Sequence, residues 1–145
     1  QIEHHWHGSA DDYATDYFGL VKSVYEKTKC SIIGHFDLLT KFNENHDIFD
    51  EKSDKYLSAA EDAVKALSKN NILFEINTGA ISRGYRTAPY PSPEIMKMIK
   101  AADGKVTFSS DCHQACDLLY GFDSALGYAK SFGFDGFWGL ELHTL

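Results

Sequence analysis

The sequence predicts an α/β fold in which parallel βα units alternate along a single domain of 145 residues. Short apolar, β-branched runs typical of buried strands alternate with longer segments whose apolar residues recur at helical spacing. Strands separated by helices of about ten residues or more indicate right-handed crossovers and a parallel sheet. No repeat, low-complexity tract or linker divides the chain, so we expect one domain.

The expected elements follow one another in a regular order. The first helix begins after Ser9, which can cap it, and carries Asp11 and Asp12 in its first turn. A later helix begins with Ser92 as N-cap and Pro93 at its first position. The spacing predicts helices near 10–24, 57–67, 93–102 and 125–132, and strands at 31–37, 72–77, 106–109 and 137–142.

Composition excludes several classes of function. The formal net charge is −7 and the chain has no cluster of Lys and Arg, which argues against binding nucleic acid and favours a small substrate. No apolar run reaches the roughly 18 residues of a membrane span, and the N-terminus does not resemble a signal peptide, so we expect a cytoplasmic protein. Cys30, Cys112 and Cys116 are expected to be free thiols.

Polar residues gather where three of the predicted strands end. They come in pairs two positions apart, so each pair can point into one cavity at the carboxyl edge of the sheet. Imidazole and carboxylate donors together suit zinc, manganese or iron. The pairs are His35 with Asp37, Glu75 with Asn77, and Asp111 with His113.

Simpler interpretations stay open for these residues. A histidine near a strand end is more often a hydrogen-bonded structural residue than a ligand. Cys112 and Cys116 lack C-x-x-C spacing, which excludes a zinc finger. The terminal histidines at 4, 5 and 7 can bind metal but are typical of solvated sequence, and those at 46 and 143 have no recognisable partner.

The loop 79–91, which follows the second predicted strand, contains the only two arginines of the chain. Arg83 and Arg86 lie beside Tyr85 and Tyr90, and their planar guanidinium groups can hold a phosphate dianion through paired hydrogen bonds. The alternative is that both arginines pair with surface carboxylates. Arginines beside candidate metal ligands favour a phosphoester substrate.

Three ordered motifs resemble the polymerase-and-histidinol-phosphatase family, in its histidinol-phosphatase branch. The first is the Gly-His-Phe-Asp stretch within 32–44. The second is Phe-Glu-Ile-Asn-Thr-Gly-Ala at 74–80, together with Ser-Arg-Gly-Tyr-Arg at 82–86 and Pro-Tyr-Pro-Ser at 89–92. The third is Ser-Ser-Asp-Cys-His at 109–113. The resemblance spans roughly residues 10–135. It implies a partial domain over 1–145 that forms the C-terminal half of a distorted (β/α)7 barrel.

The resemblance also implies a reaction and a set of residues. The complete enzyme would hydrolyse L-histidinol phosphate to L-histidinol and phosphate, a step of histidine biosynthesis. His35, Asp111 and His113 would be ligands in a trinuclear centre of divalent transition metal ions, with His35 and Asp111 at the catalytic pair of metals. Arg83 and Arg86 would hold the substrate phosphate, and Tyr85 would shape its pocket.

Other outcomes remain open because the family's N-terminal His-x-His strand and its further ligands have no clear match here. The chain can be a related phosphoesterase for nucleotides or another small phosphate, or a non-catalytic fragment that binds metal weakly or associates with a partner. Four strands would leave two open sheet edges and an exposed apolar face with Ile33 and Phe74. We therefore expect self-association, or pairing with a missing N-terminal half.

Overall fold

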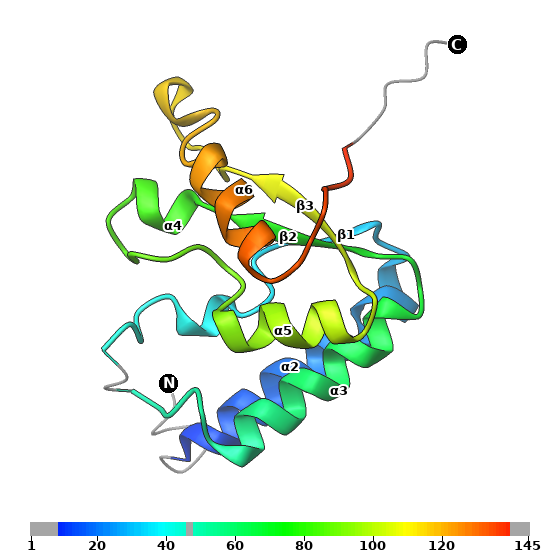
Figure 1. The fold of residues 1–145 in the computed structure, drawn as a ribbon. Coiled ribbons are helices and arrows are strands. Elements are labelled where there is room, and N and C mark those ends of the chain that lie inside the picture. The colour runs from blue at the N-terminus through cyan, green and yellow to red at the C-terminus, as the bar shows by residue number, and fades with distance from the viewer. Residues whose placement is uncertain (1–8, 46–47, 140–145) are drawn as a thin grey trace.

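The computed structural model describes residues 9–45 and 48–139 and contains a three-stranded parallel sheet with strand order β1-β2-β3. The strands alternate with helices as expected, and α2, α3 and α5 lie below the sheet in the view of Figure 1. The described part therefore has the predicted α/β class and is compatible with part of a barrel. Its elements are α2 (Ala10–Thr28), β1 (Ile32–Ile33), η1 (Leu38–Thr40), α3 (Asp54–Ser68), β2 (Leu73–Asn77), α4 (Gly79–Ser82), α5 (Pro93–Ala101), β3 (Lys105–Ser109), η2 (Ala115–Asp117) and α6 (Phe122–Ser131).

The helix starts confirm the capping signals of the sequence. The Ser9 hydroxyl accepts a hydrogen bond from the backbone N–H of Asp12 at 3.2 Å, which satisfies a donor in the first turn of α2. Ser53 caps α3 in the same way. At α5, Pro93 occupies the first turn after Ser92, although the Ser92 side chain makes no capping bond.

The first strand is shorter than predicted. β1 covers only Ile32 and Ile33, whereas the sequence predicts a strand over 31–37. The chain turns immediately afterwards because His35 adopts φ 28°, a left-handed conformation that does not continue a strand. The side-chain alternation expected from 31 to 37 therefore stops at Gly34.

An aromatic cluster joins the helices to the sheet. Phe18 of α2 is fully buried, with its ring centroid 5.3 Å from that of Phe36 and 5.2 Å from that of Tyr56 on α3. Phe36 in turn packs edge-on against Phe74 of β2 at 5.7 Å. These contacts combine area burial with favourable ring geometry, stacked for Phe18 and Phe36 and edge-to-face for the other two pairs. They fix the segment that carries His35 and Asp37 between α2 and β2.

Two expectations about the sheet are corrected. Ile33 and Phe74 do not line an exposed face, because both are buried in the core together with residues of the helices. The last predicted strand, at 137–142, is not formed at 137–139, although the Trp138 N–H donates to the Val106 carbonyl of β3 at 2.8 Å. Its remaining residues lie outside the described part of the chain. Among the described helices, none combines the length and apolar character required to cross a bilayer.

The aromatic cluster yields a stability prediction. Phe18→Ala removes a fully buried ring between α2, α3 and the sheet, and we expect the free energy of unfolding to fall by about 3–5 kcal/mol. Urea denaturation followed by circular dichroism measures the change. Leu20→Ala on the same helix is the control, because that side chain is 68% exposed and its truncation should cost less than about 0.5 kcal/mol. Equal losses in the two variants would contradict the packing described here.

Candidate functional site

The carboxyl ends of β2 and β3 meet at one edge of the sheet. The parallel register pairs Asn77 with Ser109, so the segments that follow both strands leave the sheet side by side. In Figure 1, α4 and the segment that follows β3 extend from this same end. The position agrees with the general rule that parallel sheets place their chemistry at the carboxyl ends of strands.

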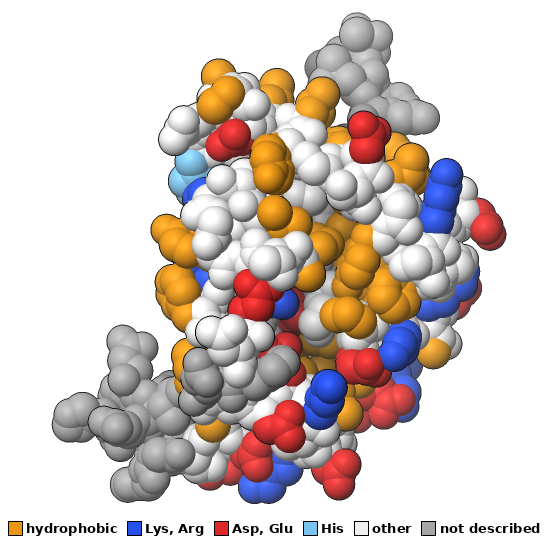
Figure 2. Space-filling model, turned by 60° about the vertical axis from the view of Figure 1, so that its left-hand side comes forward, with side chains coloured by type: hydrophobic (Ala, Val, Ile, Leu, Met, Phe, Trp, Pro, Cys, Tyr) orange, Lys and Arg blue, Asp and Glu red, His pale blue; other side chains and the backbone are white. Residues whose placement is uncertain are grey.

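A cavity of about 390 Å³ opens at this edge, a volume typical of a site for a small ligand. Figure 2 turns this end of the molecule toward the viewer and shows acidic, basic and hydrophobic side chains mixed over its surface. The cavity brings together five of the sequence-predicted site residues: His35, Arg83, Asp111 and His113, with Tyr85 at its mouth. Its lining is His35, Leu38, Lys41, Ala80, Arg83, Tyr85, Tyr90, Asp111 and His113.

Arg83 forms the centre of the cluster. Its Nη2 donates to Asp111 Oδ2 at 2.8 Å, and its Nη1 donates to the Asp111 carbonyl at 2.7 Å. The same Nη1 lies 3.0 Å from Nδ1 of His113. The guanidinium is partly exposed, so this ion pair contributes modestly to stability but fixes three side chains in one place.

The Nδ1 atom of His113 has two contacts of opposite kind. It lies 2.8 Å from the Asp111 carbonyl, which can only accept a hydrogen bond, and 3.0 Å from Arg83 Nη1, which can only donate one. The two contacts fix the position of the imidazole ring but do not assign its tautomer.

Glu75 and Asn77 share one face, as alternation along β2 predicts, but they serve the backbone instead of lining the cavity. Glu75 Oε2 accepts from the His35 N–H at 2.7 Å and from Asn77 Nδ2 at 3.0 Å. Asn77 Oδ1 accepts from the N–H of Gly79 at 2.9 Å. These bonds tie the turn after β1 and the start of α4 to the end of β2.

The prediction that His35 and Asp37 face one cavity is wrong. The left-handed backbone at His35 sends the two side chains to different places. His35 lines the cavity, whereas Asp37 is fully buried and its Oδ2 accepts from the Ser92 N–H at 2.8 Å. Asp37 therefore anchors the start of α5.

Arg86 lies apart from Arg83. It is buried, its Nη1 donates to the Thr40 hydroxyl, and its guanidinium carbon lies 4.8 Å from the centroid of the Tyr90 ring. It lines a different cavity, of about 450 Å³, together with Glu44 and other residues. The structure therefore does not bring the two arginines to one ligand, although they are three residues apart in sequence.

A buried polar cluster lies behind the site. Four of its polar atoms are buried without a hydrogen-bond partner: Asp37 Oδ1, Tyr56 Oη, Arg86 Nε and Tyr90 Oη. Burial raises the pKa of the Asp37 carboxyl, while hydrogen bonding to Ser92 and the charge of Arg86 act in the opposite direction. Burial, and next the charge of Asp37, raise the pKa of Tyr56 far above its usual value.

The aromatic residues of the loop occupy different positions. Tyr85 is 43% exposed, and its ring packs edge-on against Phe42 at 5.6 Å. Tyr90 is buried, and its backbone exchanges hydrogen bonds with Asn77 at 2.9 and 3.1 Å. Burial raises the pKa of the Tyr90 hydroxyl. Tyr85 is thus at the mouth of the cavity and Tyr90 at its wall.

The donors fit a transition metal in kind but not in their spacing. His35, Asp111 and His113 line one cavity, and imidazole and carboxylate ligands suit zinc, manganese or iron. Within residues 9–45 and 48–139, however, no group of three or more His, Cys, Asp or Glu side chains lies close enough to hold one ion. Arg83 also occupies the Asp111 carboxylate. The described residues therefore do not complete a metal centre, and the histidines at 4, 5, 7, 46 and 143 lie outside them.

Two site features were missed by the sequence reasoning. Residues 79–82 form the short helix α4 instead of a loop, and a Cβ on Gly79 would lie 2.6 Å from the Ser110 carbonyl and 2.8 Å from Asp111 Cβ. The glycine is what allows α4 to approach the Asp111 turn. Lys41 also lines the cavity. The sequence could have indicated this role, because Lys41 lies four residues after Asp37 within the 32–44 stretch that resembles the family.

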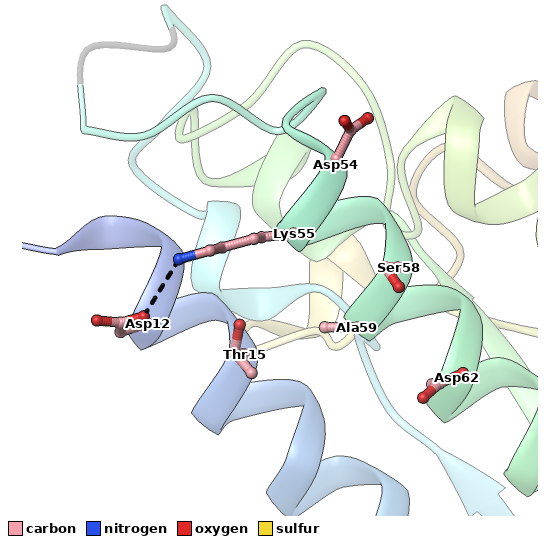
Figure 3. A pocket seen from close by; sticks show the side chains of 7 residues that line it. All are labelled: Asp12, Thr15, Asp54, Lys55, Ser58, Ala59 and Asp62. Atoms are coloured by element: carbon pink, nitrogen blue, oxygen red, sulfur yellow. Dashed lines mark ion pairs between the residues drawn. The ribbon is translucent and has the colours of Figure 1, made fainter.

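Another cavity in the described part of the chain lies away from these residues and is lined by neither histidine nor arginine. It is a groove of about 590 Å³ between α2 and α3. Figure 3 shows its carboxylates and the single ion pair drawn there, in which Lys55 Nζ lies 3.7 Å from Asp12 Oδ1. Both side chains of the pair are mostly exposed, as expected for a solvated surface.

Comparison with known proteins gives a distant relative. The chain is 27% identical over 120 residues to a probable histidinol-phosphatase of Schizosaccharomyces pombe. The match covers 81% of this chain and 39% of the relative, so the chain spans well under half of that protein's length. No family model matches the sequence. The similarity supports a distant relationship to histidinol-phosphatases at most.

The burial of Asp37 predicts a pH dependence. Because its pKa is raised in the folded protein, the native state binds an additional proton between the unfolded pKa near 4 and the folded pKa. The free energy of unfolding of the parent, relative to that of Asp37→Asn, should therefore be highest below about pH 4 and fall as the pH rises through the folded pKa.

Urea denaturation of the parent and of Asp37→Asn between about pH 3 and 8 measures this difference. Asp135→Asn, at an exposed position, is the control and should follow the parent at every pH. Parallel curves for the parent and Asp37→Asn would contradict the raised pKa.

Proposed function

We propose that the chain carries part of the active site of a cytoplasmic phosphomonoester hydrolase of histidinol-phosphatase type, which converts L-histidinol phosphate and water to L-histidinol and phosphate. The observation that carries the proposal is the contact of Arg83 with Asp111 and His113 in one cavity of small-ligand size. The distant similarity to a protein named as a probable histidinol-phosphatase supports the reaction type.

Arg83 is the proposed phosphate-binding residue. Its guanidinium reaches the cavity from the C-cap of α4, and two of its nitrogens already make short bonds to oxygen atoms of Asp111. A phosphate presents oxygens in a geometry that the same fork can hold with two parallel bonds. Arg86 is not proposed as a direct ligand of that phosphate, because it is buried against Thr40 and Tyr90. It supports the loop from behind.

His35, Asp111 and His113 are proposed to contribute ligands to the divalent metal ions of the complete enzyme, zinc, manganese or iron. Their donor atoms are of the right kind, and all three side chains line one cavity. When bound, such ions stabilise negative charge on phosphate oxygens and activate water. Further ligands must come from residues other than those described here.

A second candidate function is a non-catalytic one, in which the chain binds metal weakly or associates with a partner. It is favoured because, in the described part of the chain, no three His, Cys, Asp or Glu side chains lie close enough to hold one ion. A related phosphoesterase that acts on another small phosphate is the nearer alternative. Turnover measurements on several phosphate esters separate these three possibilities.

The hydrolase proposal predicts release of inorganic phosphate by the full-length gene product, faster from L-histidinol phosphate than from nucleoside monophosphates. Arg83→Lys should lower kcat/KM by about tenfold or more, because lysine keeps the charge but loses the fork. Lys97→Gln, whose parent side chain pairs with Glu94 on the exposed face of α5, is the control and should leave the kinetics unchanged. Equal kinetics for the parent and Arg83→Lys would exclude Arg83 as the phosphate ligand, and absence of turnover on every ester would favour the non-catalytic candidate.

The metal proposal predicts that Asp111→Asn and His35→Ala each lower the content of bound divalent metal without unfolding the chain. Elemental analysis after gel filtration measures the metal, and circular dichroism checks the fold. Asp135→Asn at the exposed end of the described chain should bind as much metal as the parent. Unchanged stoichiometry in both site variants would show that these residues are not ligands.

A further inference from the structure

Lys41 presents a charge to the cavity that no other described group neutralises. It follows η1 directly as the C-cap residue of that turn, and it lines the cavity together with Arg83, Asp111 and His113. Throughout residues 9–45 and 48–139, no carboxylate lies within ion-pair distance of its ammonium. The lysine is half-buried, so its charge is only partly screened by water.

Two aromatic rings hold the ammonium in position. Lys41 Nζ lies 4.4 Å from the centroid of the Tyr85 ring and 5.1 Å from that of Phe42. The two rings meet edge-on, with an interplanar angle of 84°. Aromatic faces attract and orient the ammonium, but they do not accept its hydrogen bonds as an oxygen atom would. Within the described part of the chain, no hydrogen-bond acceptor contacts Lys41 Nζ, so its N–H donors can serve a ligand.

Arg83 differs from Lys41 because its charge is paired with a carboxylate. Its charge is already compensated by Asp111, to which it makes two hydrogen bonds. A phosphate monoester carries nearly two negative charges at neutral pH, more than one engaged guanidinium can balance. The cavity thus combines a fork-shaped donor from the end of α4 with a free point charge from the end of η1.

From this arrangement we infer that Lys41 is a second cationic ligand for the phosphate group, held in place by Tyr85. The inference rests on the proposed phosphate site but not on the hydrolytic reaction. It also gives Tyr85 a specific role as the residue that positions the Lys41 ammonium. The ligand class is a phosphate monoester or free phosphate, whose oxygens accept the ammonium's hydrogen bonds.

Binding of inorganic phosphate to the purified full-length protein, measured by isothermal titration calorimetry, tests this inference without requiring turnover. Lys41→Met keeps the length of the side chain but removes its charge, and the dissociation constant should rise about tenfold, the size expected for one charge-assisted hydrogen bond. Lys41→Arg should restore most of the affinity. Tyr85→Ala should weaken binding by a smaller factor, because it releases the ammonium without removing it.

Lys97→Met is the matched control, since it removes the same charge from the surface of α5 and should leave the dissociation constant unchanged. Equal affinities of the parent and Lys41→Met would overturn the inference, as would equal losses in Lys41→Met and Lys97→Met. A parent protein that binds no phosphate would overturn it together with the phosphate site. Phosphate binding that depends on Lys41 in a protein with no turnover would support the inference and contradict only the hydrolase proposal.

Discussion

The candidate site depends on one carboxylate at the end of the middle strand. Glu75 accepts hydrogen bonds from the backbone of His35 and from the side chain of Asn77, and so joins the turn after β1 to the last residue of β2. Asn77 extends the connection to Tyr90 through its backbone and to Gly79 through its side chain. These bonds connect the segment that carries His35 with the start of α4, the helix that leads to Arg83. Glu75 does not line the cavity, but it holds the backbone of His35, which does.

Regular patterns predicted the framework well. Apolar spacing identified all four long helices of the described chain, and capping signals located the starts of α2 and α5. Strands β2 and β3 also lie where β-branched runs placed them. These features depend on local interactions, which a single sequence expresses directly. The parallel arrangement follows from the alternation of elements.

The site was less predictable because its backbone leaves regular geometry where the ligands begin. His35 and Asp111 both have positive φ values, 28° and 45°. A glycine or asparagine at these positions would have indicated this backbone conformation more clearly in the sequence. Alternation therefore failed for His35 and Asp37, although Asp111 and His113 still reach one cavity. The separation of Arg83 from Arg86 depends on α4, a turn too short for periodicity to reveal. No local pattern indicates which loop arginine a tertiary contact will bury.

The closed pair of Arg83 and Asp111 has a consequence for how anions reach the cavity. Because the charges of this pair offset each other, Lys41 carries the remaining formal charge among the Lys, Arg, Asp and Glu side chains that line the cavity, while the whole chain carries a formal charge of −7. Beyond a Debye length of about 8 Å at physiological ionic strength, an approaching anion experiences mostly weak repulsion. Electrostatic steering thus does not speed its capture, and added salt should raise the association rate while weakening the final contacts. Anions are selected here at contact and not at a distance.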